Sequence, residues 1–286
     1  MQFLSPTSLS DAVAAKAEHP DAVPIMGGTD VMVELNFDRH RPAWLLDLTR
    51  VPELATWDRA DGEIRLGAGV TYTRLIEELA VELPGLALAS RTVGSPQIRN
   101  RGTVGGNLRA ASPAGDTHPA LLAAFAEVEL ASVDGVRRVP VHEFYTGVKT
   151  HAGRPDELIS AIWVRPATGP QQFSKIGTRN AMVIAVAAFG LALHPGTRRV
   201  GAGIGSAAPT PRRATAAEDF LAGELDWESR GELAPSVAEE FGRLVRSAAS
   251  PIDDVRGTAA YRLHALAVMA GRCLAWTWAE HRRGAD

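Results

Sequence analysis

The spacing of apolar residues predicts alternating strands and helices at the start of the chain. An alanine-rich stretch follows Ser8 and runs to His19, which predicts a helix with Ser8 as its N-cap and Pro20 as its end. The apolar residues 22–26 predict a strand that stops at a pair of glycines, and residues 30–35 predict a helix leaving that glycine turn. A second apolar strand at residues 44–48 completes a predicted βαβ unit.

The pattern continues through the middle of the chain. Residues 63–70 alternate between polar and apolar positions, which predicts a strand, and Thr71 predicts the cap of a helix that follows. Asp134-Gly135 separates two short strand patterns and predicts a tight hairpin turn. A longer strand is expected at residues 157–164.

Residues 166–170, with the sequence Pro-Ala-Thr-Gly-Pro, form the clearest linker by composition. We place a domain boundary there, giving domains 1–168 (subdomains about 1–56 and 57–168) and 169–286. Beyond the linker, residues 182–193 predict a buried strand that returns through a Pro195-Gly196 turn. Three helices follow, of which two carry apolar stripes at helical spacing, so the fold class is α+β.

Composition excludes several classes of protein. The 286 residues carry a net charge of −3, and no basic stretch interleaves with aromatic residues, which excludes nucleic acid as a partner. The single cysteine, Cys273, excludes an internal disulfide framework and an iron–sulfur cluster held by cysteines of this chain. No apolar run approaches the ~18 residues of a membrane span. A signal peptide pattern is also absent, so we expect a cytoplasmic protein.

Two pairs of glycines are the strongest candidates for a binding site. One is Met26-Gly27-Gly28-Thr29-Asp30 and the other is Thr103-Val104-Gly105-Gly106-Asn107. Glycine admits positive φ and close approach of a ligand, so we predict two loops whose bare N–H groups hold the two halves of one pyrophosphate. Thr103 and Asn107 can add side-chain hydrogen bonds. The alternative is that both are tight turns only, because neither pair has the spacing of a known phosphate-binding motif.

Candidate chemistry outside these loops is sparse. The eight histidines are scattered without the spacing of a metal site, and no nucleophilic triad can be assembled from the sequence. We therefore expect no catalytic residue and no metal ligand on this chain. That expectation agrees with a protein whose chemistry is carried by a cofactor.

At residues 98–116 the chain resembles the FAD-binding medium subunit of the molybdenum hydroxylases, a family that includes aerobic carbon monoxide dehydrogenase. The flavin segment of xanthine dehydrogenase belongs to the same family. The stretch Ile98-Arg99-Asn100-Arg101-Gly102-Thr103-Val104-Gly105-Gly106-Asn107-Leu108 is similar to the family's second pyrophosphate loop, nearly letter for letter. Residues 26–30 resemble its first loop, and residues 112–116 resemble the stretch that ends in its flavin-contacting aspartate. The resemblance implies a two-subdomain FAD-binding fold followed by a C-terminal domain of antiparallel sheet with helices.

The resemblance also implies which residues contact FAD. They are Ile25, Met26, Gly27, Gly28, Thr29, Asp30, Val31, Ile98, Thr103, Gly105, Gly106, Asn107, Ala110, Asp116, Ile159 and Lys175. Three of them have an alternative interpretation. Asp116 accepts from hydroxyls of the flavin nucleotide or caps a helix; Lys175 pairs with reduced flavin or is a solvated strand lysine. Ile159 packs on the ring system or is an ordinary core residue.

The function implied by the resemblance is electron transfer. The chain would join a small [2Fe–2S] subunit and a large molybdenum-cofactor subunit, as a dimer of heterotrimers. It would pass electrons through FAD to an external acceptor, while the substrate is oxidised on a partner chain. Two alternatives stay open: a stand-alone FAD-dependent oxidase or reductase with the same fold, and a nucleotide-binding assembly module that undergoes no redox cycle.

Overall fold

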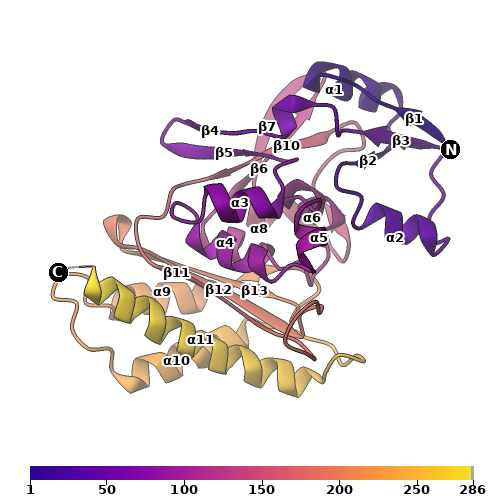
Figure 1. Ribbon diagram of the computed structural model, residues 1–286. Helices are drawn as coiled ribbons and strands as arrows, with labels where there is room; N and C mark the ends of the chain where they lie inside the picture. The colour runs from indigo at the N-terminus through magenta and orange to yellow at the C-terminus, as the bar shows by residue number, and fades with distance from the viewer. Residues whose placement is uncertain (285–286) are drawn as a thin grey trace.

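The first part of the molecule is a small parallel sheet with two helices (Figure 1). The computed structural model describes residues 1–284. The strands lie in the order β1-β3-β2, and both neighbours of β3 run parallel to it, which confirms the predicted βαβ unit. The elements are β1 (Gln2–Leu4), α1 (Leu9–Glu18), β2 (Val23–Ile25), α2 (Val31–Asn36), β3 (Trp44–Asp47) and the short 3₁₀ helix η1 (Pro52–Leu54). The Oγ of Ser8 caps α1 as predicted, accepting from the Asp11 N–H at 3.0 Å.

A five-stranded antiparallel sheet forms the middle part, with β10 at its centre. Its strands, in spatial order, are β4 (Trp57–Ala60), β5 (Glu63–Gly67), β10 (Leu158–Val164), β6 (Glu127–Ser132) and β7 (Gly135–Pro140). The predicted hairpin at Asp134-Gly135 joins β6 to β7. The same part holds α3 (Tyr72–Glu78), α4 (Pro84–Arg91), α5 (Pro96–Arg99), α6 (Val104–Ala110), α7 (His118–Ala123), α8 (Val141–Phe144), β8 (Tyr145–Gly147) and β9 (Thr150–His151). Side chains of α3, α4 and α7 share one apolar core with β5 and β10.

The last part is a four-stranded antiparallel sheet covered on one face by three helices (Figure 1). It comprises β11 (Gln171–Ile176), β12 (Ala187–His194), η2 (Pro195–Thr197), β13 (Arg199–Gly205), β14 (Arg212–Arg213), α9 (Thr215–Glu224), α10 (Pro235–Ser247) and α11 (Ala259–Arg283). The predicted hairpin through Pro195-Gly196 and the three helices are confirmed. Within residues 1–284, no helix combines the length and the apolar character that crossing a membrane requires.

Strand β12 begins later than its apolar sequence predicts. Residues 182–186 are apolar, yet the strand starts only at Ala187. Met182 has a φ of 51°, which is incompatible with an extended strand, and the Arg179 guanidinium donates to the carbonyls of Ala181 and Met182. The segment before β12 is therefore a loop folded around one arginine.

Helix α7 lies on the other face of the last sheet, at unusually short range. A Cβ atom built on Gly201 would be 1.9 Å from the Ala123 carbonyl oxygen, and one built on Gly203 would be 2.2 Å from the Pro119 carbonyl oxygen. Gly190 on β12 meets the same Pro119 oxygen at 2.6 Å. The alternating glycines of residues 201–205 thus let the backbone of a helix rest on the backbone of a strand.

We predict that Gly203→Ala lowers the free energy of unfolding by about 3 kcal/mol, because the new methyl group would overlap a backbone carbonyl that cannot rotate away. Thermal or denaturant unfolding measures this. The matched control is Gly196→Ala in η2, where no atom lies within 4 Å of the built Cβ and a change under about 0.5 kcal/mol is expected. Equal stability of the two variants would contradict the close packing of α7 against β13.

Candidate functional site

A cavity of about 570 Å³ opens between the turn from β2 to α2 on one side and α6 with the loop before α7 on the other. Its volume lies in the range of small-molecule and cofactor sites. Most of the residues expected to contact a cofactor line it, namely Ile25, Met26, Gly27, Gly28, Thr29, Asp30, Val31, Ile98, Thr103, Gly106, Asn107 and Ala110. The structure thus brings together two segments, residues 25–31 and 98–110, that are more than sixty positions apart in the sequence.

The first glycine pair forms a turn with free hydrogen-bond donors. Gly28 has a φ of 74°, and a Cβ on Gly27 would be 2.0 Å from the Arg101 carbonyl oxygen, so this turn packs directly against the second motif. Within the described residues, the N–H groups of Gly27, Gly28, Thr29 and Asp30 donate to no backbone carbonyl. All four residues line the cavity, so their unused donors can form a concave site suited to an anion.

The second glycine pair differs from its predicted loop, because it is the first turn of α6. Thr103 is the N-cap, and its Oγ1 accepts from the Gly106 N–H at 3.0 Å. The Gly105 N–H donates to the Ala68 carbonyl at 3.1 Å, and the Asn107 N–H donates to the Thr103 carbonyl at 3.1 Å. The prediction that all three N–H groups are bare is therefore wrong. Thr103, an N-cap residue type, was the signal in the sequence for a helix start.

The two glycines of α6 serve different purposes. A Cβ on Gly105 would be 2.5 Å from the Ala68 Cβ, so glycine here permits α6 to pack against the end of β5. Gly106 is exposed, and a Cβ there would meet only the Thr103 Oγ1, at 3.0 Å. Gly106 therefore leaves space in the cavity, whereas Gly105 holds its wall in place.

An ion pair between Asp116 and Lys175 joins the loop before α7 to β11. The Lys175 Nζ lies 2.6 Å from the Asp116 Oδ2, and the two side chains are only 8% and 10% exposed. Nζ also donates to the Thr92 carbonyl at 3.2 Å. Both simpler interpretations are therefore wrong: Lys175 is not solvated, and Asp116 does not cap α7, whose N-cap is Thr117.

Asp116 retains an unused acceptor. Its Oδ1 is buried and has no hydrogen-bond partner within the described residues. Burial raises the pKa of the Asp116 carboxyl above its ordinary value, and the Lys175 ammonium and the Thr92 side chain oppose that rise. A buried carboxylate oxygen without a donor is costly, so a hydroxyl-bearing ligand would satisfy it.

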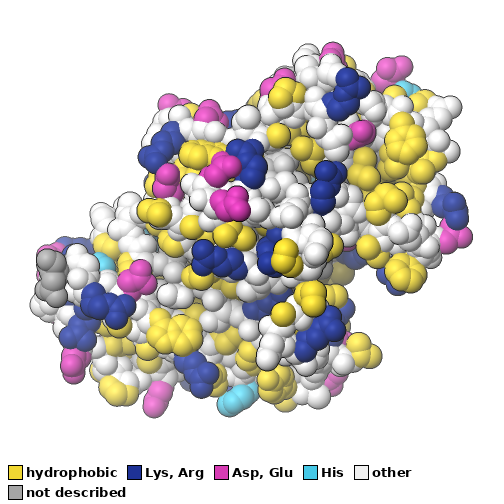
Figure 2. Space-filling model, in the orientation of Figure 1, with side chains coloured by type: hydrophobic (Ala, Val, Ile, Leu, Met, Phe, Trp, Pro, Cys, Tyr) yellow, Lys and Arg dark blue, Asp and Glu magenta, His cyan; other side chains and the backbone are white. Residues whose placement is uncertain are grey.

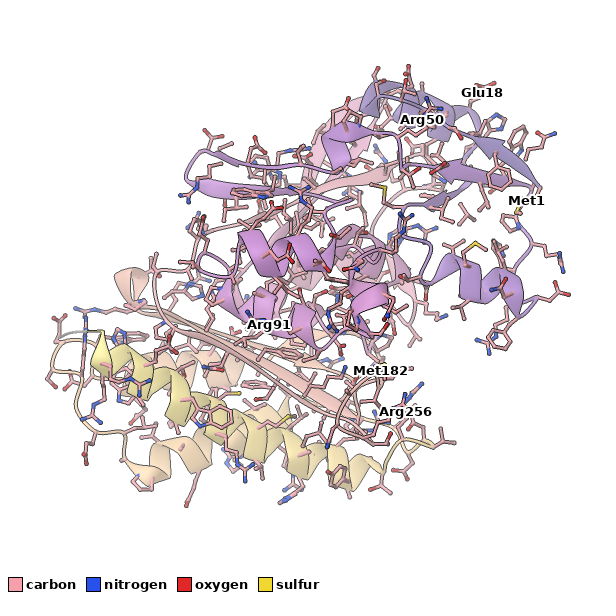
Figure 3. All side chains as sticks on the ribbon, viewed as in Figure 1. Met1, Glu18, Arg50, Arg91, Met182 and Arg256 are labelled. Atoms are coloured by element: carbon pink, nitrogen blue, oxygen red, sulfur yellow. The ribbon has the colours of Figure 1, made fainter. Side chains whose placement is uncertain are left out.

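Lys175 also lines a second cavity, of about 410 Å³, at the junction between α4, α5 and the last sheet. Among the described residues, its lining includes Arg91, Arg99 and Arg179 and no carboxylate. Figure 3 places Arg91 and Met182, which both line this cavity, at that junction. This compartment is therefore positively charged.

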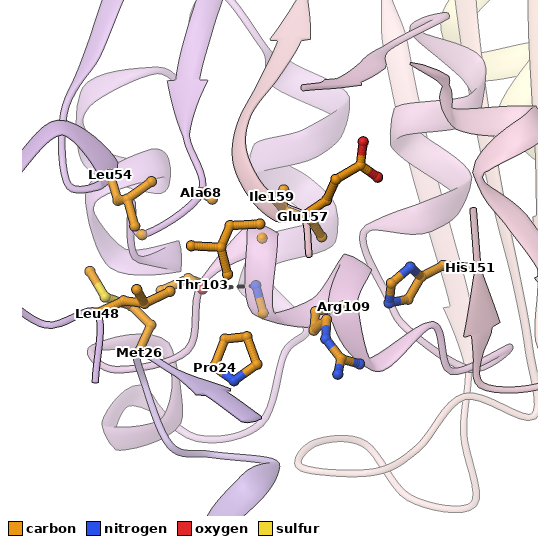
Figure 4. Close-up of a pocket in the computed structure, with 14 residues that line it drawn as sticks. Pro24, Met26, Leu48, Leu54, Ala68, Thr103, Arg109, His151, Glu157 and Ile159 are labelled. Atoms are coloured by element: carbon orange, nitrogen blue, oxygen red, sulfur yellow. Dashed lines mark hydrogen bonds between the residues drawn. The ribbon is translucent and has the colours of Figure 1, made fainter. Parts of the chain in front are cut away.

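A third, apolar pocket of about 70 Å³ adjoins the first cavity (Figure 4). Ile159 lines it with Leu48, Leu54 and Ala68, while Thr103 and Gly106 line both this pocket and the large cavity. Gly105 also faces this pocket. Ile159 is half-buried, and it lines neither of the two larger cavities, so it does not share a compartment with Lys175.

Sequence reasoning did not assign a contact to Arg109. Its side chain lines the apolar pocket, where Figure 4 shows it, and also lines the large cavity. Burial lowers the pKa of Arg109, and the nearby carboxylates of Glu34 and Asp30 oppose this effect. An arginine directly after Asn107-Leu108 was visible in the sequence, but its direction could not be read from there.

A buried histidine supports the wall of the large cavity. The Nδ1 of His118 and the hydroxyl of Tyr145 lie 2.7 Å apart, and His118 is fully buried. A Cβ on Gly115 would be 2.2 Å from the His118 Nε2, so the imidazole packs directly under the loop that lines the cavity. Burial lowers the pKa of His118 to about 3, which keeps the ring neutral.

The fold thus combines a concave site suited to an anion, an adjoining apolar pocket and a buried carboxylate with an unused acceptor. The comparisons with known proteins identify the class to which this fold belongs. Residues 1–166 match the family of FAD binding domains in molybdopterin dehydrogenases, and residues 172–277 match the CO dehydrogenase flavoprotein C-terminal domain. The chain belongs to the family of FAD-binding medium subunits of the molybdenum hydroxylases.

Individual relatives are similar over nearly the whole chain. The xanthine dehydrogenase FAD-binding subunit of Escherichia coli O157:H7 is 30% identical, over 93% of this chain and 92% of that protein. The carbon monoxide dehydrogenase medium chain of Afipia carboxidovorans is 31% identical, over 94% and 93%. Among solved structures, a carbon monoxide dehydrogenase from Hydrogenophaga pseudoflava superposes with a TM-score of 0.89 at 26% identity, covering 98% of both chains. The family relationship confirms the expected fold class and assigns the chain to the oxidoreductases.

The neutral state of His118 makes stability depend on pH. Folding lowers its pKa from 6.5 to about 3. The contribution of His118 to the free energy of unfolding is therefore fully present above pH 6.5 and is lost as the pH falls towards 3. In His118→Asn, the Asn Oδ1 can replace Nδ1 opposite Tyr145. We predict that the wild-type protein loses about 2 kcal/mol more free energy of unfolding than this variant between about pH 7.5 and pH 5.

The measurement is denaturant unfolding at a series of pH values. The control is His264→Asn, which removes an exposed histidine from α11 and should keep the wild-type pH profile. Parallel profiles for wild type and His118→Asn would show that His118 is not held neutral by the fold.

Proposed function

We propose that this chain holds one FAD along the large cavity and the two compartments beside it, and serves as the electron-transfer subunit of a molybdenum hydroxylase complex. The observation that carries the proposal is the row of free N–H donors at Gly27, Gly28, Thr29 and Asp30, in residues that line the same large cavity as Gly106. A pyrophosphate carries two negative charges, and such a row of donors neutralises it without a lysine. Arg109, at the edge of the same cavity, adds a positive charge.

The remaining compartments match the rest of an FAD molecule. The apolar pocket beside Ile159, Leu48 and Ala68 suits the adenine ring. The buried Asp116 Oδ1 lacks a donor and suits a hydroxyl of the flavin nucleotide. We place the isoalloxazine ring towards Lys175, because the basic cavity at Arg91 and Arg179 begins there.

Lys175 and Asp116 come from the two proposed domains, 1–168 and 169–286, so the cofactor would lie across their boundary. Within the first domain, subdomains of about 1–56 and 57–168 would supply the two walls of the pyrophosphate site. The ammonium of Lys175 opposes the rise in the pKa of the Asp116 carboxyl that burial causes, and it would supply positive potential next to the ring. The chemistry that FAD provides when bound is reversible electron transfer.

The proposed assembly is a dimer of heterotrimers in the cytoplasm, with a large molybdenum-cofactor subunit and a small [2Fe–2S] subunit. Electrons would arrive from the [2Fe–2S] clusters and leave to an external acceptor. The single cysteine supports a separate iron–sulfur subunit, since this chain cannot ligate a cluster with cysteines. Exposed apolar side chains at the end that carries β1 and α2 also support a partner surface there (Figure 2); they include Phe3, Met32, Val33 and Phe37.

Purification from the native host tests this function. We expect the chain to co-purify with flavin, iron and molybdenum, and photoreduced flavin on the isolated chain to be reoxidised rapidly by a dye acceptor. Turnover of a small substrate by the isolated chain would instead support a stand-alone oxidase or reductase. Bound flavin that does not cycle would indicate an assembly module.

The cofactor position yields a direct prediction for Gly106→Val. The branched side chain would occupy part of the cavity that the free N–H donors also line, so FAD content should fall at least about tenfold while the fold persists. The matched control is Gly223→Val in α9, a helical glycine with no atom within 4 Å of its built Cβ. Flavin absorbance per protein measures the outcome, and full flavin content in Gly106→Val would refute the pyrophosphate position.

A further inference from the structure

A buried threonine connects α6 to the loop before α7. Thr117 is fully buried, and its Oγ1 donates to the Asn107 Oδ1 at 2.7 Å. Thr117 is the N-cap of α7, yet its side chain makes no capping hydrogen bond. An N-cap threonine ordinarily accepts from the first turn of its own helix. Here the hydroxyl is used instead to reach a residue that lines the large cavity.

The direction of this hydrogen bond follows from the chemistry of the two groups. An amide oxygen can only accept, so the Thr117 hydroxyl is the donor and the Asn107 Oδ1 is the acceptor at 2.7 Å. Thr117 has a single hydroxyl proton, and this hydrogen bond uses it.

The consequence concerns the other end of the Asn107 amide. Because Oδ1 is bound to Thr117, the Nδ2 amino group is the end left for the cavity. An amino group donates to an anion, whereas a carbonyl oxygen in the same place would repel it. The backbone N–H of Asn107 is already used within α6, so the side chain is the part of Asn107 that remains available.

We propose that Thr117 is a positioning residue that fixes the Asn107 amide with its amino group towards the anionic part of the cofactor. This inference rests on the proposed function, since it takes FAD as the ligand. Thr117 itself need not touch the cofactor. It acts by preventing the amide from turning its oxygen into the anion site.

The test compares Thr117→Val, which keeps the shape but removes the hydroxyl, with Thr117→Ser, which keeps the hydroxyl. FAD binding to the full chain is measured by quenching of flavin fluorescence. We expect Thr117→Val to weaken binding about tenfold or more, and Thr117→Ser to restore affinity to within about threefold of wild type. Thermal unfolding without FAD checks that the variants fold.

A double-mutant cycle with Asn107→Ala separates positioning from a general structural effect. If Thr117 acts through Asn107, Thr117→Val no longer weakens FAD binding when residue 107 is already alanine. The same loss in both backgrounds, or wild-type affinity in Thr117→Val, would overturn the inference. If Thr117→Val does not fold, Asn107→Asp replaces it in the test. In that variant Oδ1 still accepts from Thr117, but the other end of the side chain presents an oxygen to the anion. Wild-type affinity of Asn107→Asp for FAD would overturn the inference. Failure of the wild-type chain to bind FAD would instead refute the proposed function.

Discussion

The close packing of α7 against the glycines of β12 and β13 is the constraint on which the site depends. Residues 116 and 117 immediately precede this helix, so the position of α7 determines where Asp116 and Thr117 lie. A helix backbone that touches strand backbone at Gly201 and Gly203 has little freedom to slide. This packing therefore determines the position at which Asp116 pairs with Lys175 of the neighbouring strand β11.

Electrostatics give the three compartments different characters. Free N–H groups at residues 27–30 and the Arg109 side chain make the large cavity a site for an anion. The basic cavity beyond Lys175 continues the positive potential towards Arg91 and Arg179. Asp116 is the buried carboxylate between them, and its pairing with Lys175 leaves one oxygen for a hydroxyl donor. A ligand with phosphates in its middle and an uncharged ring at each end fits this sequence of environments.

Much of the fold could be predicted from the sequence because its signals are local. The βαβ unit, the hairpin at Asp134-Gly135 and the three C-terminal helices follow from periodicity and turn residues. Strands β1 and β4 were missed, because they are largely exposed edge strands that mix polar and apolar residues, whereas the equally short β2 and β3 are mostly apolar. Their pairing is decided by tertiary contacts instead.

The site was predictable in its residues but less so in its geometry. The two glycine motifs do line one cavity, yet Gly105 and Gly106 begin a helix, because the Thr103 hydroxyl caps it. The Asp116–Lys175 pair spans 59 positions, so no local pattern could distinguish it from a cap and a solvated lysine. The glycines of residues 201–205 likewise resemble an ordinary twisted strand until the Pro119 backbone is seen against them.

Hydrogen–deuterium exchange of the full chain with and without FAD tests the central claim most directly. If the cofactor lies across the two domains, FAD should slow exchange together at residues 26–31, 112–117 and 171–176, and leave α10 and α11 unchanged. The first group tests the free N–H donors themselves, and the last tests the strand that carries Lys175. Protection confined to one domain, or centred on α10 and α11, would contradict the account.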